Sequence, residues 1–169
     1  MKLTFFLLGI LLALILLNFS RPVYFNIFTH SLPYGIYVKI NGTPQRDDYA
    51  ATCLSVPIAQ YGIAREYLAQ GHCSTGTVMV LKKIKGIPGD RYVLRGRTLQ
   101  INAKEYPLKD KDSRGRALKI FYPPAADVLG KGKYILLSDF VPNSWDSRYW
   151  GPVGIEFLLK PLWLFEADH

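Results

Sequence analysis

The longest uninterrupted hydrophobic stretch of the chain lies at its N-terminus. Residues 3–19, LTFFLLGILLALILLNF, contain no charged residue. As a helix they would span about 25 Å, close to the thickness of the hydrocarbon core of a bilayer. The alternative is a cleaved signal peptide, but the following LNFSRP lacks an A-x-A cleavage site. We therefore expect residues 1–20 to be a membrane anchor. Lys2 before the apolar run indicates an N-terminus in the cytoplasm, with residues 21–169 outside it.

The rest of the chain is dominated by short apolar runs and by alternation of apolar and polar residues. Alternation with a period of two is typical of β-strands, and the two halves of residues 91–108 flank Gly96 as in a β-hairpin. Further strands are expected in residues 36–40, 78–81, 118–124, 133–140 and 155–165. These patterns predict a mostly β protein, antiparallel and closed or partly closed.

Helical periodicity outside the anchor is almost confined to the segment between the two cysteines. Cys53 and Cys73 enclose residues 56–71, which have an apolar side at helical spacing. A disulfide closing this segment would contribute about 3 kcal/mol in an oxidising compartment; two unpaired buried thiols are the alternative. A zinc site is not expected, because two cysteines without C-x-x-C and three histidines do not form a tetrahedral set. The prediction is a small helical insert of about residues 53–73.

Composition indicates one folded domain with a basic middle. The chain is 49% hydrophobic and 14% aromatic, which excludes general disorder and allows one proper core. Its net charge is +8, and residues 82–133 hold fourteen Lys or Arg against five Asp or Glu. This region is a solvated basic face, or it attracts anionic lipid or an acidic partner. Nucleic acid is not expected as a partner, because no recognised nucleic-acid module accompanies the charge.

Lys82 is a candidate for catalysis because of its place in the pattern. The apolar residues 78–81 lead to it, and Gly86, Pro88 and Gly89 predict a turn shortly after it. Burial against an apolar sheet can lower a lysine pKa by about 3 to 5 units, which makes the amine a base near pH 7. Most of the 21 Lys and Arg residues must be solvated, so Lys82 needs partners to support this role.

Two polar stretches offer such partners. Ser31 lies at a bend predicted by Pro33 and Gly35, and His30 is a poor candidate for its base because adjacent side chains diverge. Residues 138–154 are rich in Asp, Asn, Ser and Pro. There, Asp139, Asp146 and Arg148 are predicted to form an ion-pair network, and Ser144 could orient an amine, although such residues also serve in ordinary turns.

Three stretches, in this order, resemble the conserved boxes of bacterial type I signal peptidases. HSLPYGIY resembles the nucleophile box, KKIKGIPGD the lysine box K-R-x-x-G-x-P-G-D, and SDFVPNSWDSRYWGPV the box G-D-N-R-x-x-S-x-D-S-R-Y-[WF]-G. The short S-L-P-x-G form and the cysteine-flanked insert are most similar to the conjugative-transfer branch, the TraF-type peptidases. The resemblance covers essentially the whole chain and implies an antiparallel signal-peptidase-like β fold without cofactor or metal.

The resemblance also implies roles for particular residues. Ser31 would be the nucleophile and Lys82 the general base, and the Thr29 hydroxyl with the Ser31 N–H would hold the oxyanion. The supporting residues would be Ser144, which hydrogen-bonds the lysine, together with Asp139, Asp146 and Arg148. Candidate walls of the substrate pocket are Phe28, Leu32 and Leu81.

The chain departs from the family pattern at several positions. Ser138 and Phe140 replace the glycine and asparagine of G-D-N, and Lys83 replaces an arginine. Lys85 is a rival amine, but strand alternation directs it to the face opposite Lys82.

The resulting hypothesis is a membrane-anchored serine endopeptidase of the bacterial inner membrane with a periplasmic catalytic domain. Its partners would be membrane lipid and an exported precursor, the pilin of a conjugative type IV secretion system, released by water or as a cyclic product. The alternatives are a general leader peptidase and a non-catalytic membrane-anchored assembly protein. A self-cleaving repressor relative is disfavoured by the apolar N-terminus and the missing DNA-binding helical domain.

Overall fold

The computed structural model describes residues 23–26, 30–123 and 126–164. The predicted anchor, residues 1–20, and the predicted site residues Phe28 and Thr29 lie outside this part of the chain. Within the described residues, no helix combines the length and the apolar character needed to cross a bilayer.

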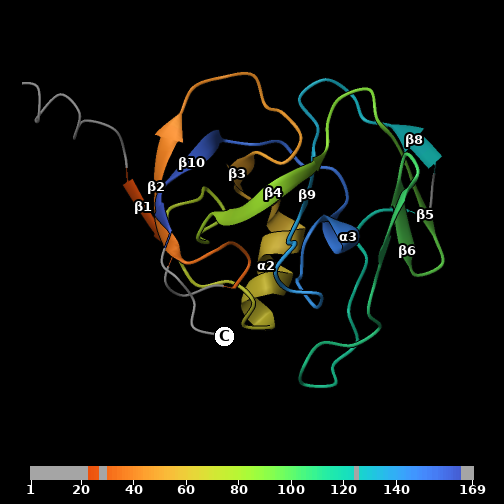
Figure 1. Ribbon diagram of the computed structural model, residues 1–169. Coiled ribbons are helices and arrows are strands. Elements are labelled where there is room, and N and C mark those ends of the chain that lie inside the picture. Colours follow the sequence, from red (N-terminus) through yellow and green to blue (C-terminus); the bar gives the residue numbers. More distant parts are fainter. Residues whose placement is uncertain (1–22, 27–29, 124–125, 165–169) are drawn as a thin grey trace, which may run out of the picture.

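The strands of the described chain form two antiparallel sheets, as the alternation predicts (Figure 1). The larger sheet has the strand order β1-β2-β10-β3-β4-β9. Its strands are β1 (Val23–Asn26), β2 (Gly35–Ile40), β3 (Tyr49–Thr52), β4 (Val80–Gly86), β9 (Ile135–Leu137) and β10 (Phe157–Leu164). The smaller sheet has the order β7-β6-β5-β8, with β5 (Arg91–Arg95), β6 (Thr98–Ile101), β7 (Lys104–Pro107) and β8 (Ala126–Val128).

The hairpin predicted around Gly96 is confirmed. β5 pairs antiparallel with β6, with Arg95 opposite Thr98 and Leu94 opposite Leu99. Gly96 has φ 55° at the tight turn, a left-handed conformation that glycine adopts without a steric penalty.

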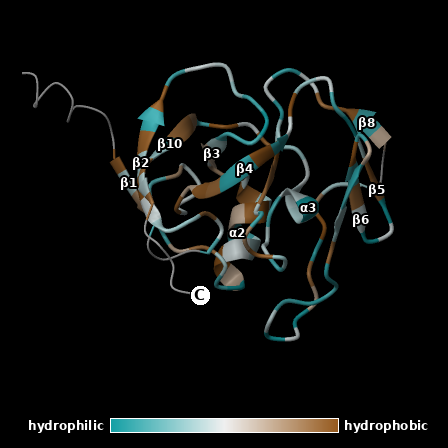
Figure 2. Ribbon diagram, viewed as in Figure 1, coloured by the Kyte–Doolittle hydropathy of each residue, from teal (hydrophilic) through white to brown (hydrophobic). Residues whose placement is uncertain are grey.

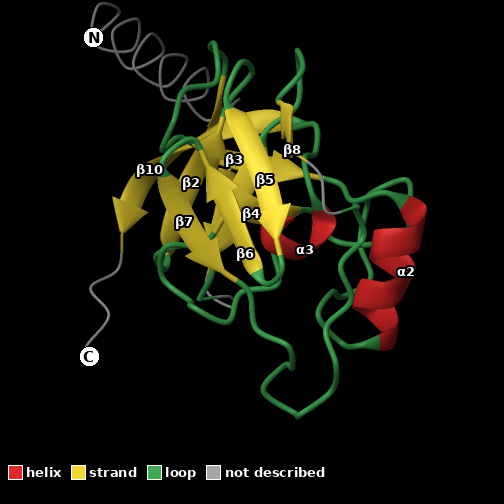
Figure 3. Cartoon of the chain, turned by 90° about the vertical axis from the view of Figure 1, so that its right-hand side faces the viewer, coloured by secondary structure: helices red, strands yellow, loops and turns green. Residues whose placement is uncertain are grey.

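The helical insert is present, but it is shorter than predicted. Helix α2 (Val56–Ala64) follows Cys53, and the disulfide to Cys73 is formed. The helix ends early because the N–H groups of Tyr67 and Leu68 both turn back to the carbonyl of Gly62. Figure 3 shows α2 on the side of the molecule away from β10, apart from the strands.

The prediction of a strand in residues 118–124 is wrong for residues 118–123, the part that the structure describes, because these residues form no strand. Their backbone makes scattered single bonds, from Leu118 N–H to the Asp110 carbonyl and from Phe121 N–H to the Tyr149 carbonyl. The apolar side chains there pack on the core, so their apolarity reflects burial rather than pairing with a strand. A proline at position 123 removes one N–H that a ladder would need.

Three elements near the site, among them β1, have no counterpart in the predictions. β3 lies between β4 and β10, and its Ala50 and Ala51 are fully buried. Helix α3 (Ser147–Trp150) is a single turn that begins after Asp146 and lies between β9 and the smaller sheet in Figure 1.

Three clusters of buried apolar residues form the core of the described chain. One cluster joins Leu94 and Leu99 of the smaller sheet to Ile135, Leu137 and α3. The charged residues 109–116 form a loop that Figure 2 colours mainly as hydrophilic, at the bottom of the view. The core is therefore continuous between the two sheets, while this loop extends into solvent.

Candidate active site

The structure brings Ser31 and Lys82 together. Lys82 is the third residue of β4, not the residue after a strand as predicted, because the ladder with β3 and β9 continues to Gly86. Its side chain is hydrogen-bonded from Nζ to Oγ of Ser31. Lys82 is 5% exposed, so its amine has almost no access to solvent.

The environment of Lys82 brings the pKa of its amine closer to neutral pH. Burial lowers the pKa of Lys82 from 10.5 to about 8, because the ammonium loses its hydration. The negative charge of Asp146 opposes this shift, and the positive charge of Arg148 adds to it. An appreciable fraction of the amine is therefore uncharged near neutral pH.

Side chains from two strands and one loop form hydrogen bonds to the turn that contains Ser31. Asn26, at the end of β1, donates from Nδ2 to the carbonyls of Leu32 and Pro33, both at 3.0 Å. The Tyr37 hydroxyl, on β2, also donates to the Pro33 carbonyl at 2.7 Å. The carbonyl of Ser31 accepts from Oγ of Ser138 at 2.9 Å. This turn is therefore anchored to the sheet and to the 138–146 loop.

Asp146 and Arg148 form a buried ion pair, as predicted. Arg148 donates from Nε to Asp146 Oδ1 and from Nη2 to Oδ2, both at 2.9 Å. Asp146 also accepts from the Arg148 N–H and thereby caps α3. Arg148 further donates to the carbonyls of Pro142 and Ser144, so the pair holds the loop that surrounds Lys82.

Asp139 does not join that pair, so the predicted three-residue network is wrong. It pairs instead with Lys83 at 3.1 Å and with Lys85 at 2.7 Å, and Lys85 also contacts Asp47 at 2.5 Å. The reason is strand geometry, because residues 83 and 85 share one face of β4 and residue 82 lies on the other. Burial alone would raise the pKa of Asp139, but its hydrogen bonds from Lys85 and Lys83 outweigh this and lower it.

Ser144 does not hydrogen-bond Lys82, which corrects the contact implied by the motif. Its Oγ is buried and has no hydrogen-bond partner among the described residues. The backbone sets this position, because the Ser144 N–H donates to the Val141 carbonyl and its own carbonyl accepts from Arg148.

The predicted pocket walls have different environments. Leu32 is 1% exposed and packs with Tyr37, Ala51 and Leu159, so it belongs to the core rather than to an open pocket. Leu81 is partly buried at the edge of the same cluster, where it remains a candidate wall. His30 contacts the Tyr34 hydroxyl at 2.9 Å, as expected for a residue that is not the partner of Ser31.

Sequence reasoning missed Asn26 and Tyr37 and treated Ser138 only as a departure from the motif. Their contacts join residues that are far apart in the sequence, such as Ser138 and Ser31, so no local pattern indicated them. The Asn26 amide is buried, and buried amides usually have hydrogen-bond partners, but neither its burial nor the strand that it ends was predicted from the sequence.

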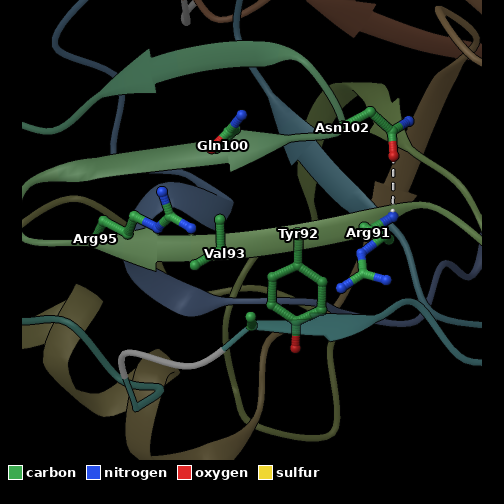
Figure 4. A pocket seen from close by; sticks show the side chains of 7 residues that line it. Arg91, Tyr92, Val93, Arg95, Gln100 and Asn102 are labelled. Carbon is green, nitrogen blue, oxygen red and sulfur yellow. Dashed lines mark hydrogen bonds between the residues drawn. The ribbon is translucent and has the colours of Figure 1, made fainter.

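A hollow of about 420 Å³ lies elsewhere, on β5 and β6 of the smaller sheet (Figure 4). Its lining includes Arg91, Arg95 and Gln100 but neither Ser31 nor Lys82. The candidate active site is thus distinct from this hollow.

Comparison with known proteins identifies the family of the chain. The family model "Signal peptidase, peptidase S26" matches residues 2–159. A plasmid transfer protein TraF of Escherichia coli is 30% identical over 75% of this chain and 73% of its own. A conjugal transfer protein TraF of Agrobacterium tumefaciens (strain 15955) is 29% identical over 60% of this chain and 58% of its own.

Among solved structures, a signal peptidase I from Enterococcus faecalis V583 is similar, with 23% identity and a TM-score of 0.37. The match covers 70% of this chain and 98% of that one. By the family model and the TraF relatives, the chain belongs to the type I signal peptidase family, peptidase S26, in which it groups with the TraF proteins.

Proposed function

We propose that the chain is a serine endopeptidase in which Ser31 is the nucleophile and Lys82 the general base. The observation that carries this proposal is the hydrogen bond between Lys82 Nζ and Ser31 Oγ, made by a lysine that is 5% exposed. A pKa of about 8 gives that amine the basicity that proton abstraction near neutral pH requires.

The reaction follows from these two groups. The neutral Lys82 amine takes the proton of Ser31 Oγ while Oγ attacks the scissile carbonyl, which forms a tetrahedral oxyanion. When the peptide bond breaks, the Lys82 ammonium gives this proton to the leaving amine, and an acyl ester remains on Ser31. We assign the oxyanion to the Ser31 N–H and the Thr29 hydroxyl on the motif alone.

The substrate is proposed to bind as an added strand on β4. β4 pairs with β3 along Val80–Lys83, but with β9 only from Lys83 onward. The second edge of residues 80–82 therefore has no paired strand among the described residues, and an extended peptide bound there would lie beside Lys82. Leu81 would line the pocket for a small side chain.

We propose residues 1–20 as the inner-membrane anchor and residues 21–169 as a periplasmic catalytic domain. The disulfide between Cys53 and Cys73 supports an oxidising compartment. Two exposed aromatic residues on the strands that flank β2 support lipid contact. Phe25 of β1 is 63% exposed and Trp163 of β10 is 67% exposed, and both lie opposite Ile36 in register.

The proposed substrate is the pilin subunit of a conjugative system, because the relatives are named for plasmid and conjugal transfer. Water can release the acyl-enzyme as a linear product. Attack by the amino group of the pilin itself would release a cyclic product, lighter than the linear one by one water.

The test is maturation of a candidate pilin precursor in cells that express wild type, Ser31→Ala or Lys82→Ala, read by intact mass. We expect either variant to leave the precursor uncleaved, with at least about a thousandfold loss of cleavage rate for the purified proteins. Ser113→Ala and Lys131→Ala are matched controls on the exposed surface, and both should process normally.

Mature pilin in cells with either active-site variant would contradict the proposal and favour a non-catalytic assembly role. A peptide panel addresses substrate range. Efficient cleavage of generic A-x-A signal sequences would instead favour a general leader peptidase.

A further inference from the structure

Ser138 connects two parts of the site that are far apart in sequence. Its Oγ donates to the Ser31 carbonyl at 2.9 Å, across 107 residues of chain. Its own N–H donates to Asp146 Oδ2 at 3.2 Å. One residue therefore links the turn of the proposed nucleophile to the buried Asp146–Arg148 pair.

The remaining hydrogen bonds of the hydroxyl determine its direction. Ser138 Oγ accepts from the N–H groups of Phe140 at 3.2 Å and Val141 at 3.3 Å. A hydroxyl has one proton and two acceptor positions, so both acceptor positions are occupied. The single proton is left to point at the Ser31 carbonyl.

We infer that Ser138 is a positioning residue for Ser31, whose hydroxyl keeps the Ser31 backbone in the orientation that directs Oγ toward Lys82. This inference rests on the proposed function of the Ser31–Lys82 pair. The Ser31 carbonyl accepts its side-chain hydrogen bond from Ser138, in the 138–146 loop. The carbonyls of the next two residues accept theirs from Asn26 on β1 and Tyr37 on β2.

The contact is a property of this chain rather than of the family motif. Ser138 stands where the motif G-D-N has glycine, and glycine has no side chain to donate a hydrogen bond. Losing the bond removes one constraint on the orientation of the Ser31 peptide, and small displacements of reacting groups have large effects on rate.

The test compares wild type with Ser138→Ala, Ser138→Gly and Ser138→Thr as full-length proteins in detergent micelles. The probe is a fluorogenic peptide that reproduces the cleavage region of the pilin precursor, and kcat and KM are measured separately. We expect Ala and Gly to lower kcat about tenfold with KM within twofold of wild type, the scale of one hydrogen bond. Ser138→Thr keeps the hydroxyl and should restore kcat to within about threefold.

The controls separate positioning from folding and from the proposed function. Ser113→Ala, in the exposed loop, should keep wild-type kcat, and thermal unfolding reports the fold of each variant. Wild-type kcat in Ser138→Ala, or a Thr variant as slow as the Ala variant, would overturn the inference. In either case, inactive Ser31→Ala protein leaves the proposed function standing, whereas active Ser31→Ala protein contradicts that function itself.

Discussion

At the scale of single residues, Lys82 is a lysine whose charged form is disfavoured by burial. Its amine lies near the Arg148 guanidinium in a site that excludes water, and its pKa falls to about 8. Lys85, three residues along β4, is also buried but has a raised pKa, because Asp139 and Asp47 outweigh the effect of burial. Removing the charge of Lys82 should therefore increase the stability of the protein, whereas removing the charge of Lys85 should decrease it.

Lys82→Met should abolish cleavage and stabilise the protein near pH 7. The folded state binds the Lys82 proton with a pKa of about 8 against 10.5 for the unfolded chain, so burying the ammonium costs about 3 kcal/mol below pH 8. Between pH 8 and 10.5 the folded protein has lost this proton and the unfolded chain is losing it. The cost therefore disappears over this range, and wild-type stability increases.

Chemical denaturation at a series of pH values measures this difference. Lys85→Met is the matched control and should be destabilising, because it leaves Asp139 without one of its partners. A Lys82→Met protein less stable than wild type at pH 7 would show that the amine is not buried in the way described.

At the scale of elements, the insert stabilises the loop that contains Asp146. Trp145 precedes Asp146, and its ring lies 5.2 Å from that of Tyr67 and 6.0 Å from that of Tyr61. Gly62 of α2 packs so closely on Trp145 that an added Cβ would come within 2.9 Å of it. We therefore expect the disulfide that closes the insert to support the Asp146 loop through this aromatic contact.

Replacing Cys53 and Cys73 together by serine should lower the free energy of unfolding by about 3 kcal/mol, as expected for a loop of this length. Urea titration followed by circular dichroism measures the loss. Wild-type protein titrated with reductant should approach the stability of the double variant. Equal stability of the oxidised wild type and the variant would contradict a stabilising role for the insert.

The elements that could be predicted are those whose pattern is local. The hairpin at Gly96, the last strand and the cysteine-closed helix follow from alternation, turn residues and periodicity. The strand β3 could not be predicted, because its alanines are buried on both faces and show no alternation. A strand was wrongly predicted in residues 118–123, because their apolar side chains pack on the core without forming a strand.

The same distinction applies to the site. Ser31, Lys82, Asp146 and Arg148 were predicted because each lies in a short motif, and the structure brings these motifs together. The ion pair of Asp139 with Lys85 was not predicted, because it depends on which face of β4 each lysine occupies in the folded sheet. The lack of a hydrogen-bond partner for Ser144 Oγ among the described residues was not predicted either, because it depends on the conformation of the loop.

At the scale of the whole molecule, the site lies where distant parts of the chain converge. β4 supplies Lys82 from the larger sheet, the turn after β1 supplies Ser31, and the loop between β9 and α3 supplies Ser138 and Asp146. No single element contains all of these residues, so the geometry of the site depends on packing of the two sheets and α3 against one another.

The most direct test of the Ser31–Lys82 pair is the pH dependence of single-turnover acylation of Ser31, followed by mass spectrometry of the acyl-enzyme. If the neutral Lys82 amine is the base, the rate should reach a plateau above a midpoint near pH 8 and fall about tenfold per pH unit below it. A rate that is the same at pH 6 and pH 9, or an acyl group on a residue other than Ser31, would contradict the account.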